Sequence, residues 1–152
     1  MEAQKRQKTV AEKMGVKPMT QALLINAPGQ SVAAMRLPTL KMLKSLNEED
    51  TFDYLHLFAT TQDQMHEWFP VMRDRLHSGG MLWVSWPKGG RLGTDLTMKS
   101  VISIGYTHTM VESICLRIDE VWAGLKFTHP KPGKKYANSY GTLPNQKSPQ
   151  RP

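Results

Sequence analysis

Eight side chains that could hold a ligand lie at or near the ends of apolar runs in this 152-residue chain. They combine a carboxamide, a hydroxyl, two indoles, two cations and two adjacent carboxylates: Asn26, Ser85, Trp86, Lys88, Arg91, Asp119, Glu120 and Trp122. Indoles stack on flat ligands, cations bind anions, and paired carboxylates hold a metal or share a proton. Core packing, a solvated loop and a turn are the simpler interpretations. We treat the eight as a candidate binding edge and expect no catalytic residue among them.

The other reactive side chains do not form a catalytic or metal-ligating pattern. The five histidines are scattered, and no two have the i, i+4 spacing of a helical zinc site. Ser85 lacks the Gly-x-Ser-x-Gly setting of a hydrolase nucleophile. The single cysteine, Cys115, excludes an internal disulfide and a multi-cysteine zinc site, and its apolar neighbours predict a buried core residue. The sequence thus predicts no metal centre.

Apolar runs separated by turn residues predict the elements that position this edge. Strands are expected at residues 22–25, 52–59, 81–86, 113–118 and 122–128. Thr61-x-x-Gln64 has the spacing of a capping box and predicts a helix to about residue 77, ended by Gly79-Gly80. Thr9-x-x-Glu12 has the same spacing and predicts a short helix that stops at Gly15.

A further helix is expected from Asp95, a good N-cap, to about residue 108. The exposed amides at its start could bind an anion together with Lys88 and Arg91. The last two strands are joined tightly at Asp119-Glu120.

The order strand, helix, strand predicts a mostly parallel α/β sheet with helices on both faces. Ligands of such sheets bind outside the carboxyl ends of the strands. We expect Ile25, Phe58, Trp86 and Ile118 to finish side by side, with the last strand returning antiparallel. That geometry would bring the eight candidate side chains to one rim.

The basic character of the chain is confined to its ends. Net charge is +7 and the pI is near 9.6, but residues 18–120 hold nine basic and eleven acidic residues. The composition predicts a basic arm at 1–8, one domain at 9–129 and a basic disordered tail at 130–152. Such ends bind polyanions weakly and without sequence preference. No secretory signal and no membrane span are expected, so the cytoplasm is the expected compartment.

Five segments, LLINAPG, FDYLHLFATT, GGMLWVSWPKG, DLT and IDEVWAGLKF, resemble a family of small bacterial proteins catalogued as a domain of unknown function. The resemblance runs over residues 9–127. More distantly, residues 51–128 resemble the second half of a Rossmann-like methyltransferase that depends on S-adenosylmethionine (SAM). The resemblance implies a reduced Rossmann-like sheet of about five strands with a C-terminal antiparallel hairpin.

The first half of the chain departs from the methyltransferase pattern. Where that family has a glycine-rich turn after the first strand, this chain has Asn26-Ala27-Pro28-Gly29, and Pro28 removes a backbone donor. Little room follows for a second strand with a terminal acidic residue. We therefore expect no cofactor, with SAM as the alternative.

Three functions remain open from the sequence. The first is a non-catalytic binding or regulatory protein with a protein or small-molecule partner. The second is a reduced SAM-dependent methyltransferase-like enzyme. The third is an accessory nucleic-acid or ribonucleoprotein binder that acts through its basic tails.

Overall fold

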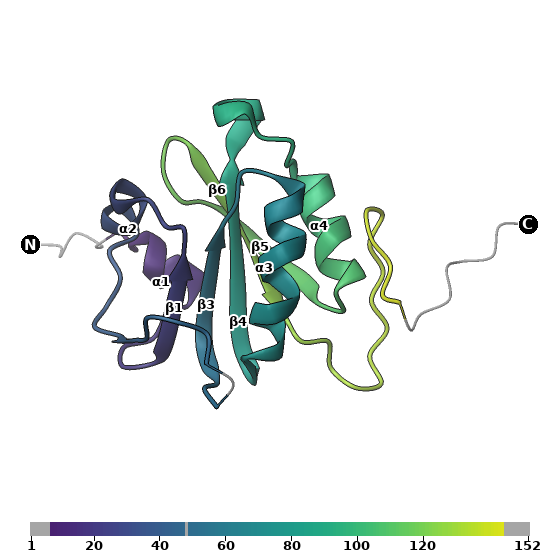
Figure 1. The fold of residues 1–152 in the computed structure, drawn as a ribbon, viewed down its shortest axis with the longest axis horizontal. Helices are drawn as coiled ribbons and strands as arrows, with labels where there is room; N and C mark the ends of the chain where they lie inside the picture. Colours follow the sequence, from purple (N-terminus) through teal and green to yellow (C-terminus); the bar gives the residue numbers. More distant parts are fainter. Residues whose placement is uncertain (1–6, 48, 145–152) are drawn as a thin grey trace, which may run out of the picture.

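In the part of the chain that the computed structural model describes, residues 7–47 and 49–144, six strands form one sheet (Figure 1). They are β1 (Gln21–Ile25), β2 (Lys41–Met42), β3 (Phe52–Phe58), β4 (Leu76–Pro87), β5 (Val111–Arg117) and β6 (Trp122–Thr128). Their order across the sheet is β2-β1-β3-β4-β6-β5. The sequence predicts five of them. It misses β2, because two exposed residues carry no recognisable apolar pattern.

The direction of the strands confirms the expected fold class. Strands β2, β1, β3 and β4 run parallel, whereas β6 is antiparallel to both β4 and β5. The chain adds β2 on one side of β1 and β3 on the other side. The point between β1 and β3, where the direction of strand addition reverses, is the switch point of the sheet.

Helices cover both faces of the sheet, as expected. The helical segments are α1 (Val10–Met14), α2 (Gly29–Met35), α3 (Gln62–Asp74), the 3₁₀ segment η1 (Lys88–Gly93) and α4 (Met98–Thr107). Helices α3 and α4 bury Phe69 and Val101 in one apolar core. Helices α1 and α2 bury Met14 and Met35 in a second core on the opposite face.

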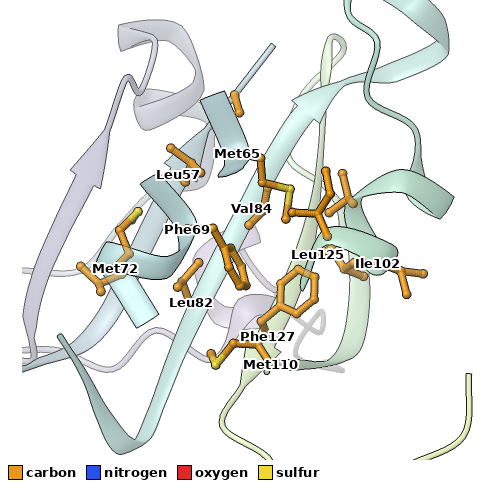
Figure 2. Close-up of a cluster of buried hydrophobic side chains, with 14 of the residues drawn as sticks. Leu57, Met65, Phe69, Met72, Leu82, Val84, Ile102, Met110, Leu125 and Phe127 are labelled. Atoms are coloured by element: carbon orange, nitrogen blue, oxygen red, sulfur yellow. The ribbon is translucent and has the colours of Figure 1, made fainter. Parts of the chain in front are cut away.

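The core beneath α3 and α4 is apolar and densely filled (Figure 2). The rings of Phe69 on α3 and Phe127 on β6 meet edge to face, with centroids 5.1 Å apart. Gly105 allows α4 to lie directly on this ring, since a Cβ atom there would be 2.0 Å from Cε1 of Phe127. A side chain at position 105 would therefore force α4 away from the sheet.

Helix caps explain where three of the helices begin. Thr9 and Glu12 form the expected capping box of α1, and Thr61 accepts a hydrogen bond from the Gln64 amide at the start of α3. The N-cap of α4, however, is Thr97 rather than Asp95. Asp95 instead accepts a 2.8 Å hydrogen bond from the amide of Gln62 on α3. The residue caps a helix, but one that lies distant in the sequence.

The expectation that Gly79-Gly80 ends the helix before it was wrong. Helix α3 ends at Asp74, and both glycines lie inside β4. The pairing of β3 with β4 shifts register here, between Phe52 and Tyr54. A Cβ atom on Gly80 would lie 3.0 Å from the Phe52 carbonyl oxygen. Glycine at this position permits a close approach of two backbones in a bulge.

Two further expectations differ from the structure. Cys115 is exposed on β5 instead of buried, because β5 is the outermost strand and β6 is its partner. Of the tail expected to be disordered, residues 130–144 pack beside α4 (Figure 1). Leu143 is 4% exposed, and Asn138 donates a hydrogen bond to Glu112. Residues 1–6 of the basic arm and 145–152 of the tail lie outside the described residues.

No helix among the described residues is both long and apolar enough to cross a membrane. The compartment remains a prediction from the sequence.

Candidate functional site

The carboxyl ends of the parallel strands meet at one edge of the sheet, as predicted. Ile25 pairs with Leu57, Phe58 pairs with Ser85, and Pro87 pairs with Trp122. The amide of Ile118 donates to the carbonyl of Trp122, which brings the end of β5 to the same place. We call this side of the molecule the carboxyl edge.

The switch point lies at the β1 and β3 end of the carboxyl edge. Asn26 follows β1 with a φ of 59°, a left-handed conformation that Asn tolerates better than most residues. Its side chain is exposed and has no hydrogen bond to another described residue. After β3, the backbone amide and hydroxyl of Thr60 both contact Gln64, and Thr94 donates to the Thr60 carbonyl. Asn26 is therefore a polar side chain at the switch point that is available to a ligand.

A second group of candidate residues surrounds the turn between β5 and β6. One Asp119 carboxylate oxygen accepts a 2.6 Å hydrogen bond from Ser31 on α2, and the other accepts from the amides of Val121 and Trp122. Burial alone would raise the pKa of Asp119. The bonds from Ser31 and the two amides, together with the charge of Lys88, outweigh burial and lower it.

A hollow of about 370 Å³ lies next to this turn. Its walls are formed by Val10, Lys13, Ala34, Arg117, Ile118, Asp119 and Glu120. Glu120 is exposed, whereas Asp119 is half-buried and engaged in the hydrogen bonds given above. The two neighbouring carboxylates therefore have different environments and do not form a symmetrical pair.

Three of the candidate residues are buried in the two cores. Trp86 is 4% exposed in the core beneath α3 and α4. Trp122 is 7% exposed in the other core and meets the ring of Phe58 edge to face at 5.2 Å. Ser85 is fully buried. Both indoles therefore pack in the cores next to the carboxyl edge and do not present a face to a ligand.

The two cations of the edge contact the backbone. Lys88 Nζ donates to the Asp119 carbonyl at 3.0 Å, and Arg91 donates to the Lys88 carbonyl at 3.0 Å. The start of α4 is closed by a reciprocal capping box between Thr97 and Ser100. Both cations thus bind backbone carbonyls and two amides at the start of α4 bind side chains, and an anion site at this place remains a prediction.

The structure also shows a buried polar chain that the sequence analysis missed. Tyr54 Oη lies 2.6 Å from His56 Nδ1, and His56 Nε2 lies 2.7 Å from Ser85 Oγ. Burial lowers the pKa of His56 to about 3, so its imidazole is neutral near pH 7. Burial also raises the pKa of Tyr54. The alternation of Tyr54, His56 and Phe58 along β3 shows that they share a face, but only the pairing with β4 identifies Ser85.

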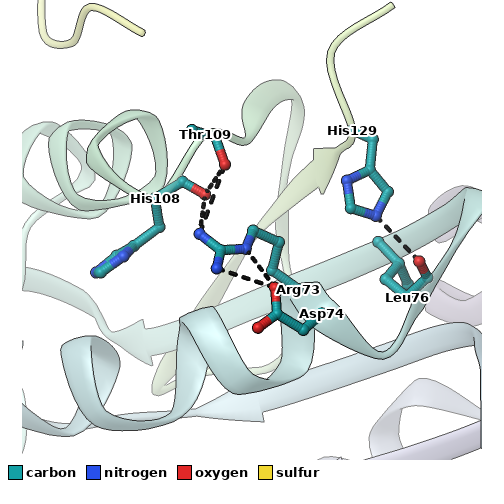
Figure 3. Close-up of polar contacts among 6 residues, drawn as sticks. All are labelled: Arg73, Asp74, Leu76, His108, Thr109 and His129. Carbon is teal, nitrogen blue, oxygen red and sulfur yellow. Dashed lines mark hydrogen bonds and ion pairs between the residues drawn. The ribbon is translucent and has the colours of Figure 1, made fainter. Parts of the chain in front are cut away.

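A second unexpected pair joins α3 to the end of α4. His66 Nδ1 lies 2.9 Å from His108 Nε2, although 42 positions separate them. Arg73 donates to the His108 carbonyl at 2.9 Å and forms an ion pair with Asp74 (Figure 3). Within the described residues, no group of three or more His, Cys, Asp or Glu side chains is arranged to hold a metal.

Comparison with known proteins identifies the class of fold and not the family. No protein-family model matches this chain, and no curated protein matches it. Solved structures do match. One is the ribosomal protein L11 methylase from Lactobacillus delbrueckii subsp. bulgaricus, with 12% sequence identity and a TM-score of 0.52. The match covers 80% of this chain and 75% of the methylase chain. An S-adenosylmethionine-dependent methyltransferase from Clostridium acetobutylicum has 6% identity and a TM-score of 0.53, with 80% and 88% covered. The LepI structure in complex with SAM has 13% identity and a TM-score of 0.51, with 80% and 39% covered.

These likenesses confirm a Rossmann-like, methyltransferase-like fold. They also correct the expectation that no cofactor is involved, since one of these neighbours is described as SAM-dependent and another was solved with SAM. That expectation rested on the proline in the turn after β1 and on the little room left for a second strand, but a single missing amide is weak evidence against binding and the structure does form a second strand, β2. The resemblance to the small bacterial family remains a prediction.

Proposed function

We propose that this chain is a reduced methyltransferase-like protein that binds SAM, or its demethylated product, at the switch point of the carboxyl edge. The observation that carries this proposal is the strand order, in which β1 lies between β2 and β3 and β6 returns antiparallel between β4 and β5. Ligands of open α/β sheets bind where the strand order reverses. The likeness to methyltransferase structures supports SAM as the ligand.

The side chains at the switch point suit a nucleoside. The Asn26 carboxamide provides a donor and an acceptor, and it is exposed and unpartnered among the described residues. The exposed carboxamide of Gln30 on α2 adds a second such group. Ala27 and Pro28, both half-buried, offer apolar surface between them. These groups would hold the base and ribose by hydrogen bonds and apolar contact.

The chain lacks one feature of the methyltransferase pattern. After β2 come Leu43 and Lys44 in place of an acidic residue, so the ribose hydroxyls would depend on Asn26. SAM supplies an activated methyl group when bound. The Asp95 carboxylate already accepts a hydrogen bond from the amide of Gln62, so we assign it no proton transfer. Asn26 and Gln30 would bind and orient the ligand.

Isothermal titration calorimetry of the full chain with SAM and with its demethylated product tests the proposal. We expect saturable binding of at least one of them. Asn26→Gly keeps the left-handed backbone accessible and removes the carboxamide, and it should weaken binding about tenfold. Asn47→Gly, in the connection between β2 and β3, is the matched control and should bind normally. Absence of heat with both ligands at millimolar concentration, or equal loss in both variants, would refute the proposal.

The other predicted partners rest on sequence alone. A protein partner and weak polyanion contact through residues 1–8 and 130–152 remain predictions. Deleting residues 145–152 and measuring retention on heparin would test the second, and unchanged retention would exclude that segment as the cause.

A further inference from the structure

The histidine pair on α3 and α4 has a geometry that suits a metal ion. We propose that His66 and His108 form a binding site for a divalent transition-metal ion with square-planar preference, best represented by Cu²⁺. The two nitrogens that face each other are 2.9 Å apart, and the ring centroids are 5.1 Å apart at an interplanar angle of 68°. None of the residues assigned to SAM binding takes part in this site.

Two imidazole ligands favour a late first-row metal ion. Two imidazole nitrogens in adjacent positions of a square plane, each bonded at about 2.0–2.1 Å, are about 2.9 Å apart, whereas tetrahedral ligands of zinc are about 3.3 Å apart. The 2.9 Å between the two nitrogens is the length of their hydrogen bond, so both rings start close to the positions from which their lone pairs can reach one metal ion. Copper(II) also binds nitrogen ligands most tightly among the divalent first-row metals. Water would complete its coordination, because His66 is exposed to solvent.

Metal binding at this pair requires no release of a proton, because each neutral ring can keep its hydrogen on the outer nitrogen. In the present hydrogen bond, one inner nitrogen carries the hydrogen and the other accepts it. For both inner nitrogens to bind the metal, the donor ring must carry its hydrogen on its outer nitrogen instead. This tautomer is accessible to a neutral imidazole, and both rings must turn so that their lone pairs converge. Protonation of either ring competes with the metal, so affinity should fall in acid.

The surroundings of the pair hold one ring in place and limit the local positive charge. The backbone of His108 is fixed by Arg73, which donates to its carbonyl, and its ring lies against Phe69 with centroids 5.9 Å apart. The Arg73 guanidinium would repel a metal ion, but it is paired with the Asp74 carboxylate at 2.9 Å. Asp63 lies one turn before His66 on α3 and adds a negative charge. Burial, followed by the proximity of His66 and Arg73, lowers the pKa of His108, which favours the neutral ligand.

Titration with Cu²⁺ followed by electron paramagnetic resonance tests the site. All proteins should carry Cys115→Ser, because an exposed thiol reduces and binds copper. We expect one equivalent of Cu²⁺ to bind with a spectrum of two coordinated imidazole nitrogens. His66→Ala should weaken binding about tenfold or more. Because His66 is exposed, the variant should fold normally, and circular dichroism checks this.

The matched control is His77→Ala, which removes another exposed histidine and should leave the binding unchanged. A second measurement uses the melting temperature: Cu²⁺ should raise it in the Cys115→Ser protein and in His77→Ala, but not in His66→Ala. Equal affinity in His66→Ala and His77→Ala, or a spectrum with one nitrogen, would overturn the proposal.

Discussion

The two faces of the sheet are built from alternate residues of the same strands, yet they are packed by different means. Toward α3 and α4, strands β3 and β4 present Leu55, Leu57, Leu82 and Val84, which pack by apolar contact alone. Toward α1 and α2, the intervening residues include the hydrogen-bonded chain of Tyr54, His56 and Ser85. Apolar packing tolerates small rearrangements, whereas a buried polar chain is satisfied in one register. The difference suggests that the first face supplies most of the stability and the second fixes the alignment of β3 with β4.

The largest effect is expected from a truncation on the apolar face. Phe127→Ala removes a fully buried ring in contact with Phe69 and should lower the free energy of unfolding by about 3–5 kcal/mol. Urea denaturation measures this loss. Ile114→Ala, at a 40% exposed position on β5, is the control and should change little. A small effect of Phe127→Ala would mean that this face does not dominate stability.

A smaller but more specific effect is expected on the polar face. His56→Leu leaves the hydroxyls of Tyr54 and Ser85 without their partner and should cost about 2–3 kcal/mol. Removing both hydroxyls as well, with Tyr54→Phe and Ser85→Ala, should restore part of the loss, because no buried polar group is then left unsatisfied. If the triple variant is less stable than His56→Leu, the chain does not act as a unit.

Acid should weaken the polar face selectively. His56 is neutral in the folded protein, with a pKa lowered by burial to about 3, but it titrates near 6.5 when unfolded. The unfolded state therefore binds more protons between these values, and stability falls as pH decreases through this window. From pH 6.5 to pH 5.0, His56 should lower the free energy of unfolding by about 1.6 kcal/mol. Urea denaturation at both pH values measures it, and the triple variant without His56 should show a shallower dependence.

The smallest effect concerns the contact that ties α2 to the turn between β5 and β6. Ser31→Ala removes one hydrogen bond to Asp119 but leaves two backbone amides on that carboxylate. The free energy of unfolding should fall by about 1 kcal/mol. The pKa of Asp119, followed by nuclear magnetic resonance, should rise because a stabilising donor is lost. An unchanged pKa would show that Ser31 does not stabilise the charge.

The sequence predicts those features that depend on local pattern. Apolar runs locate β1, β3 and β6, and the spacing of Thr9 and Thr61 locates two helix starts. Parallel strands must end together, so the position of the carboxyl edge also follows from the pattern. The expectation of no cofactor was wrong, because the departures in the first half of the chain were given more weight than the order of the later elements.

What the sequence could not predict depends on contacts between distant segments. Asp95 is a residue type typical of N-caps, but the tertiary fold brings its carboxylate to the first amide of α3. Gly79-Gly80 resembles a helix stop, yet the two glycines serve the close approach of β4 to β3. The pairing of His66 with His108 requires the packing of α3 against α4, and no spacing in the sequence indicates it.

The place of β6 in the sheet has a consequence for how the chain folds. Strand β5 is synthesised before β6, but its neighbour in the sheet is β6, which separates it from β4. A nascent chain that has emerged only as far as residue 121 can assemble the parallel strands while β5 has no strand beside it. Completion of the sheet must therefore wait for residues 122–128, and a ribosome stalled before them would leave the edge of the apolar strand β4 unpaired and open to aggregation.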